Sequence, residues 1–103
     1  MGIAYYVGAY KDFVVEAPKQ IPESMHYFEK GTPVFVTVTF YLPKPANPAN
    51  PYPVGDVDNY CKSILDAITK NGTYWKDDAQ VIQLVATKTY TETEPRTVVM
   101  IHS

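Results

Sequence analysis

The chain of 103 residues has the length of one domain, and 46% hydrophobic with 19% charged residues is typical of a folded globular protein, which excludes a disordered chain. Its formal net charge of −2 and its single arginine, Arg96, are unusual for a protein that binds nucleic acid through many phosphate contacts. One cysteine excludes an internal disulfide, and no apolar run has the length of a membrane span, so we expect a soluble cytoplasmic protein.

The first thirty residues give the weakest structural signals. Ile3–Val7 and Phe13–Ala17 are short apolar stretches, which we interpret as strands that pair with each other. After two prolines, residues 23–30 predict a short helix that ends at Gly31.

Residues 33–42 predict a β-strand. β-Branched and aromatic side chains alternate there with a period of two, and both faces carry apolar groups, which indicates a central strand covered on at least one side. Residues 43–53 contain five prolines and predict an extended loop that cannot pair as a central strand.

Residues 58–70 predict a helix whose N-cap is Asp58 or Asn59 and whose end is Asn71–Gly72. Spacing of i, i+3, i+4 and i+7 places four apolar side chains on one face: Cys61, Ile64, Leu65 and Ile68.

Two more strands are expected at Val81–Tyr90 and Arg96–Ile101, and the polar turn between them favours an antiparallel hairpin. Together these elements predict an α+β fold, with a mixed sheet of three or more strands and the main helix packed on it.

A second face of the predicted helix is charged, because Asp58, Lys62 and Asp66 follow one another at intervals of four. Asp56 precedes them in the entering loop, and Asp77–Asp78 follow the loop that leaves the helix. Hard carboxylate oxygens are the ligands that Mg²⁺ prefers, and bound Mg²⁺ promotes phosphodiester cleavage. A neighbouring lysine can stabilise the developing charge. We interpret the group as a candidate Mg²⁺ site for such chemistry.

Each part of this group also has an ordinary structural interpretation. An aspartate before a helix is often only an N-cap, which applies to Asp56 and Asp58. Lys62 and Asp66 then form a solvated pair, and Asp77–Asp78 form a turn.

Two other motifs fit less well. An EF-hand loop that starts at Asp56 is excluded, because its fifth and twelfth positions are Tyr60 and Ala67. A phosphotransferase acting on small nucleotides is disfavoured, because the chain has no glycine-rich phosphate loop.

The charged residues belong to one extended motif. It runs D-V-D-N-Y-C-K from Asp56, then L-D-A from Leu65, then Gly72, then D-D-A-Q-V from Asp77, and finally Lys88. Over about residues 33–101 this combined pattern resembles the signature of the RusA family of Holliday junction resolvases.

The resemblance implies a role for each matching position. Asp56, Asp58 and Asp78 match the catalytic aspartates that bind Mg²⁺, for which Mn²⁺ is an alternative, and Lys62 matches a functionally important lysine. Positions with an expected supporting or structural role are Asn59, Asp66 and Asp77.

The resemblance further implies a single RusA-like domain over residues 1–103 and a bacterial or phage origin. It implies a homodimer that cuts the two opposed strands of a four-way DNA junction, since two-fold symmetry suits a two-fold substrate. The alternative is a catalytically inactive RusA-like module that binds DNA or protein. The two differ in whether Asp56, Asp58 and Asp78 converge within reach of a metal ion.

Several residues near the motif are further candidates for DNA contact. Tyr52 and Val54 are apolar groups before Asp56 that are suited to wedge into a junction centre. Candidate phosphate contacts are Lys44, Lys76 and Lys88.

Other residues have a structural and a functional interpretation. Tyr74 and Trp75 are expected to pack against the helix rather than to stack on bases. Cys61 is expected in the core, and His26 and His102 lack the spacing of metal ligands.

Overall fold

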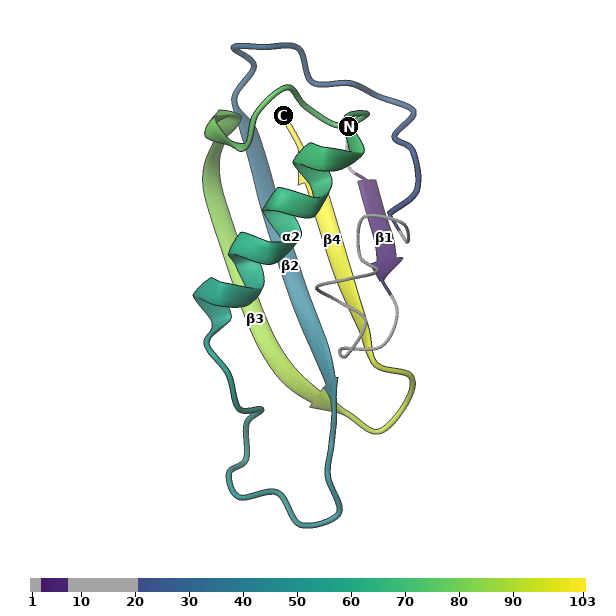
Figure 1. Cartoon of the computed structure of the whole chain (residues 1–103), viewed down its shortest axis with the longest axis vertical. Helices are drawn as coiled ribbons and strands as arrows, with labels where there is room; N and C mark the ends of the chain where they lie inside the picture. Colours follow the sequence, from purple (N-terminus) through teal and green to yellow (C-terminus); the bar gives the residue numbers. More distant parts are fainter. Residues whose placement is uncertain (1–2, 8–20) are drawn as a thin grey trace.

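The computed structural model describes residues 3–7 and 21–103. It shows a mixed four-stranded β-sheet in the order β1-β4-β2-β3, and a helix, α2, crosses one face of this sheet (Figure 1). The strands are β1 (Ile3–Val7), β2 (Val34–Pro43), β3 (Val81–Thr91) and β4 (Arg96–His102). Helix α2 is Val57–Asn71, and a 3₁₀ turn, η2 (Asp78–Gln80), leads into β3. The predicted α+β class is confirmed.

Strand β2 lies inside the sheet, as its apolar groups on both faces predict. It pairs with β3 in parallel and with β4 in antiparallel orientation. The side chains facing α2 are buried, among them Val36, Val38 and Phe40. The opposite face is more exposed, so the helix covers one side of the sheet.

The predicted hairpin of the last two strands is wrong. Strand β3 lies at the sheet edge beside β2, and β4 lies on the other side of β2. The path β2–α2–β3 is a crossover unit, which brings two parallel strands side by side. The turn at residues 92–95 then passes the end of β2 to reach β4, so neighbours in sequence are not neighbours in the sheet.

The N-terminal predictions have mixed outcomes. Ile3–Val7 forms β1 as expected, but it pairs antiparallel with β4. Phe13–Ala17 lies outside the described residues. The helix predicted at residues 23–30 is wrong, because this segment consists of bends and a turn. The Phe28 amide donates to the Tyr74 carbonyl at 2.8 Å, and Phe28 forms a parallel bridge with Trp75, which an intact helix would prevent.

Helix α2 matches the predicted range to within one residue at each end. It ends where expected, with Gly72 in the left-handed conformation at φ 81°. Its N-cap is Asp56 instead of Asp58 or Asn59. Cys61, Ile64 and Ile68 are buried against the sheet, as the apolar stripe predicts. In the part of the chain that the structure describes, no helix is long and apolar enough to cross a lipid bilayer.

Candidate functional site

Asp56 marks the point where the proline-rich loop turns into α2. Its carbonyl oxygen accepts from the amides of Asn59 and Tyr60 at 3.1 and 3.2 Å, which starts the helix. Its carboxylate makes no capping hydrogen bond and is exposed. Capping by the side chain therefore does not account for this aspartate, and the carboxylate is available to a ligand.

Two side chains hold the loop that carries Asp56. The Lys88 ammonium, from β3, donates to the carbonyls of Pro53 and Gly55 at 2.8 and 2.6 Å. The Tyr60 hydroxyl, from α2, donates to the Val54 carbonyl at 2.7 Å. Both groups bind backbone, so they fix the approach to Asp56. In this structure Lys88 positions the loop, and its predicted phosphate contact remains a prediction.

The same loop presents two apolar groups to solvent. Tyr52 is 53% exposed and Val54 is 73% exposed, immediately before the first aspartate of the motif. The Lys88 ammonium lies 5.5 Å from the centre of the Tyr52 ring, which orients the ring without covering it. The wedge function of these side chains stays a prediction, which requires exposed apolar groups on a supported loop.

The second acidic pair belongs to η2, at the start of β3. The Asp77 carboxylate accepts from the Ala79 amide at 3.1 Å and completes a capping box with Gln80. The pKa of Asp77 is lowered, first by this backbone hydrogen bond and then by its hydrogen bond with Asp78. Asp77 therefore caps the 3₁₀ turn η2.

Asp78 has the opposite electrostatic environment. Its pKa is raised, first by partial burial, then by the hydrogen bond and negative charge of Asp77, and also by the charge of Asp66 on α2. A carboxyl group that is partly buried and lies near like charges is harder to ionise. The structure thus brings Asp66 and Asp78 within electrostatic range of each other.

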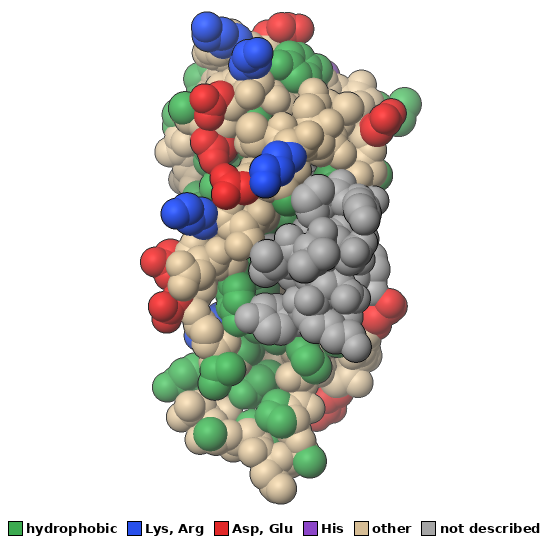
Figure 2. Space-filling view, viewed as in Figure 1, with side chains coloured by type: hydrophobic (Ala, Val, Ile, Leu, Met, Phe, Trp, Pro, Cys, Tyr) green, Lys and Arg blue, Asp and Glu red, His purple; other side chains and the backbone are tan. Residues whose placement is uncertain are grey.

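The exposed face of α2 carries the charged series that the sequence predicts. Asp58, Lys62 and Asp66 are all exposed. Acidic and basic side chains are interleaved over this side of the molecule (Figure 2). Among the residues described, the ion pair that forms joins Lys44 to Glu92, and Lys62 does not pair with Asp66. The ammonium of Lys62 therefore stays available on a surface between carboxylates.

One chain does not bring Asp56, Asp58 and Asp78 together. Within residues 3–7 and 21–103, no three carboxylate, imidazole or thiol groups are placed to hold a metal ion. The Asp56 loop contacts Lys88, whereas Asp78 precedes Val81, and seven residues of extended strand between these positions span about 23 Å. Figure 1 likewise shows η2 and the first turn of α2 apart along the long axis.

The donor chemistry nevertheless fits Mg²⁺. All candidate ligands are carboxylate oxygens, and Mg²⁺ is commonly held by one or two protein carboxylates together with water and phosphate oxygens. Each end of the charged face supplies such a pair, Asp56 with Asp58 at one end and Asp66 with Asp78 at the other. Each pair by itself supplies two of the carboxylates from which a larger set of metal ligands could be built.

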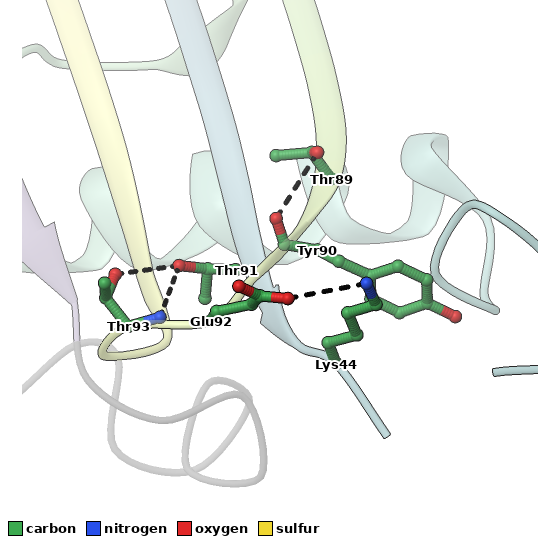
Figure 3. A network of polar contacts seen from close by, with 6 residues as sticks. All are labelled: Lys44, Thr89, Tyr90, Thr91, Glu92 and Thr93. Atoms are coloured by element: carbon green, nitrogen blue, oxygen red, sulfur yellow. Dashed lines mark hydrogen bonds and ion pairs between the residues drawn. The ribbon is translucent and has the colours of Figure 1, made fainter. Parts of the chain in front are cut away.

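Lys44 and Lys76, two further candidates for phosphate contact, lie at opposite ends of the sheet. Lys44 follows β2 and pairs with Glu92 at 3.5 Å, next to the hydroxyl contacts of Thr91 and Thr93 (Figure 3). Lys76 precedes η2, and its amide donates to the Gln80 side chain at 3.1 Å. An exposed pair such as Lys44–Glu92 is weak and breaks readily when a phosphate competes.

Burial agrees with the structural interpretation of Tyr74, Trp75 and Cys61, and each of the two histidines contacts a phenylalanine ring. Tyr74 and Trp75 are fully buried, and the Trp75 indole donates to the Thr69 hydroxyl at 2.8 Å, which excludes base stacking. Cys61 lies in the core, and burial, followed by the charge of Asp58, raises the pKa of its thiol. His26 contacts Phe28 edge-on, and His102 stacks on Phe35.

Sequence reasoning missed the role of Gln80. Its side-chain amide donates to the carbonyls of Phe28, Glu29 and Thr32 at 3.2, 2.9 and 3.3 Å. It thereby ties the turn before β2 to the acidic segment before β3. The spacing of Asp77 and Gln80 is that of a capping box, a signal that was present in the sequence but gave no long-range partner.

The chain is similar to known proteins over most of its length. A family model described as "Endodeoxyribonuclease RusA" matches residues 2–102, nearly the whole chain. A protein of Bacillus subtilis (strain 168), named "Uncharacterized protein YqaN", is 39% identical over 83 residues. That similarity covers 67% of this chain and 56% of the relative, so the chain spans little more than half the length of this curated relative.

Proposed function

The chain belongs to the RusA endodeoxyribonuclease family, and from this membership we propose that it is a Mg²⁺-dependent, structure-selective endodeoxyribonuclease that resolves Holliday junctions or other branched DNA. The observation that carries the proposal is the series of carboxylates from Asp56 along α2 to Asp78. In this series the Asp56 carboxylate is exposed and makes no capping hydrogen bond, and Asp78 is partly buried near the charges of Asp77 and Asp66. A cytoplasmic location is part of the same proposal.

In this proposal Asp56, Asp58 and Asp78 hold the metal ion, with Mn²⁺ as an alternative. When bound, the ion would stabilise negative charge on the phosphoryl oxygens and favour attack by water. Lys62, on the same helix face and without an ion pair to any described residue, provides a positive charge for the phosphate as negative charge develops on it. Lys88 and Tyr60 keep the Asp56 carboxylate in place by fixing the loop before it.

We propose a homodimer as the active form. The three aspartates lie at two separate places in one chain, so a second copy that sets its Asp78 beside Asp56 and Asp58 would complete the set. Two such sites related by a two-fold axis also suit paired cleavage of a four-way junction.

An uncovered apolar row on the sheet supports a second copy. Val85 and Met100 are 50% and 43% exposed, and both lie beside Thr37 on the face opposite α2. We expect light scattering to give twice the chain mass of 11.6 kDa. Val85→Glu with Met100→Glu should give monomers with retained circular dichroism. Dimers that persist in this variant would place the contact on another surface. A monomeric wild type would contradict the proposed homodimer.

Cleavage of a labelled four-way junction tests the proposed activity. The wild type and Asp58→Asn are compared with and without Mg²⁺, beside a linear duplex of the same sequence. We expect paired nicks on the junction that require both Mg²⁺ and Asp58, with the duplex spared. Glu23→Gln is the matched control, since it neutralises an exposed carboxylate outside the motif.

The other outcomes separate the alternatives. Junction binding without cutting by the wild type would favour the inactive RusA-like module. Cutting that persists in Asp58→Asn would remove this residue from the metal site. If the wild type neither binds nor cuts the junction, the nuclease proposal fails.

A further inference from the structure

A hollow of about 410 Å³ lies beside the acidic pair of η2. It is bounded by the turn before β2 and by the segment that enters β3, and its wall includes Lys30, Lys76 and Ile82. Basic side chains gather at this end of the molecule in Figure 2. The hollow is distinct from the loop of Asp56, which lies near Lys88.

The two lysines are held on a defined backbone. The Thr32 amide donates to the Glu29 carbonyl at 2.9 Å, so residues 29–32 form a β-turn with Lys30 in its second position. Gly31 occupies the third position with φ 90°, as the tight turn requires. Lys30 is thereby presented at the tip of the turn, where it is exposed.

Gln80 fixes the distance between the two lysine-bearing segments. Its amide nitrogen donates to the carbonyls of Glu29 and Thr32 on the turn, while its amide oxygen accepts from the Lys76 backbone amide. One side chain thus bridges the Lys30 turn and the Lys76 segment. Because this bridge joins the two backbone segments, the fold itself places Lys30 near Lys76, so they are not two independent surface charges.

Neither ammonium is neutralised by an ion pair within the described part of the chain. Lys30 and Lys76 form no ion pair with another described residue. The lining also includes the Asp77 carboxylate, so the two lysines leave it with a net charge of +1. In a chain with a formal net charge of −2, two unpaired lysines on one rim form a local site for an anion.

We propose that the Lys30–Lys76 hollow binds the phosphodiester backbone of the DNA strand next to the Asp78 end of the site. This inference rests on the proposed nuclease function and adds to it a phosphate-binding site, with Lys30 as a contact that the family motif does not include. The two ammonium groups contact phosphate oxygens, and Ile82 and Pro33 provide an apolar surface for the sugar. The site orients the strand and carries no base specificity.

Salt-dependent binding tests the inference. Affinity of a labelled four-way junction is measured by fluorescence anisotropy at several salt concentrations without divalent metal, so that cleavage plays no part. For Lys30→Gln with Lys76→Gln we expect about tenfold weaker binding and a salt slope reduced by about 1.8, or about 0.9 for each lost phosphate contact. Lys30→Arg with Lys76→Arg should restore both values.

Lys70→Gln, compared with the single changes Lys30→Gln and Lys76→Gln, is the matched control, because it removes one charge from an exposed position outside the hollow. If this control weakens binding and lowers the slope equally, or if the Lys30–Lys76 variant binds like the wild type, the inference is overturned. If the wild type binds and cuts the junction but the Lys30–Lys76 variant binds no more weakly than the control, the inference fails and the proposed function stands. A wild type that neither binds nor cuts removes both.

Discussion

Asp78→Asn is expected to abolish junction cleavage while it makes the metal-free protein more stable at neutral pH. Loss of one carboxylate ligand should lower the rate by at least about a hundredfold. The pKa of Asp78 is raised by burial and by the neighbouring charges of Asp77 and Asp66. Because the folded-state pKa lies above the unfolded one, its stabilising contribution is complete only at low pH and is lost as pH rises through the raised value.

At pH 7 the charged Asp78 therefore opposes folding, and asparagine removes that repulsion. We expect the Tm to rise by about 2 °C, since partly exposed charge interactions amount to only a few tenths of a kcal/mol. The difference should vanish below about pH 4, where aspartate itself is protonated. Thermal unfolding of both proteins from pH 3 to pH 8 without metal measures it. A fall in Tm at neutral pH would mean that Asp78 has a structural role.

Mixing two inactive variants tests whether the aspartates come from different chains. Asp58→Asn and Asp78→Asn are each expected to be inactive. In a mixed dimer with shared sites, one site regains Asp58 from one chain and Asp78 from the other, so nicking of one junction strand returns. If each chain contains its own complete site, the mixture stays inactive. Asp58→Asn mixed with Asp58→Asn/Asp78→Asn is the matched control, since neither site can be restored.

The central strand and main helix follow from local patterns in the sequence. Alternation over residues 33–42 and the apolar stripe from Cys61 to Ile68 correspond to β2 and α2, because both elements bury a face that their own periodicity defines. The pairing of β3 could not be predicted from local sequence patterns. A short turn favours a hairpin locally, but the crossover through α2 places β3 parallel to β2, and this outcome depends on packing of the helix.

The candidate site shows the same division between local and long-range information. The motif identifies the aspartates, but it gives no distance between Asp56 and Asp78, which the helix and strand set far apart. The helix expected at residues 23–30 was also wrong for a long-range reason. That segment uses its backbone to bind Tyr74 and the Gln80 side chain, partners about fifty positions away in the chain.

Gly55→Ala is expected to destabilise the protein strongly and to displace the first two aspartates. Gly55 has φ 95°, a conformation that other residues rarely adopt, and it directly precedes Asp56. An added Cβ would lie 2.8 Å from Cζ of Tyr60 and closer still to its hydroxyl oxygen. The ring cannot simply move away, because it is buried and its hydroxyl donates to the Val54 carbonyl. Strain and collision together should cost about 2–4 kcal/mol and lower the Tm by about 10–20 °C.

Gly31→Ala is the matched control, since Gly31 has φ 90° and an added Cβ would meet nothing within 4 Å. It should cost only the backbone strain, about 1 kcal/mol. Combining Gly55→Ala with Tyr60→Phe should cost less than the sum of the two single changes, because the hydroxyl collision is already gone. Equal losses for Gly31→Ala and Gly55→Ala would show that the Tyr60 contact is unimportant. Junction cleavage below the melting temperature completes the test, with Gly72→Ala as its control, since Gly72 has φ 81° and an added Cβ would also meet nothing within 4 Å. If the contact positions Asp56, folded Gly55→Ala cuts poorly where folded Gly72→Ala cuts like the wild type.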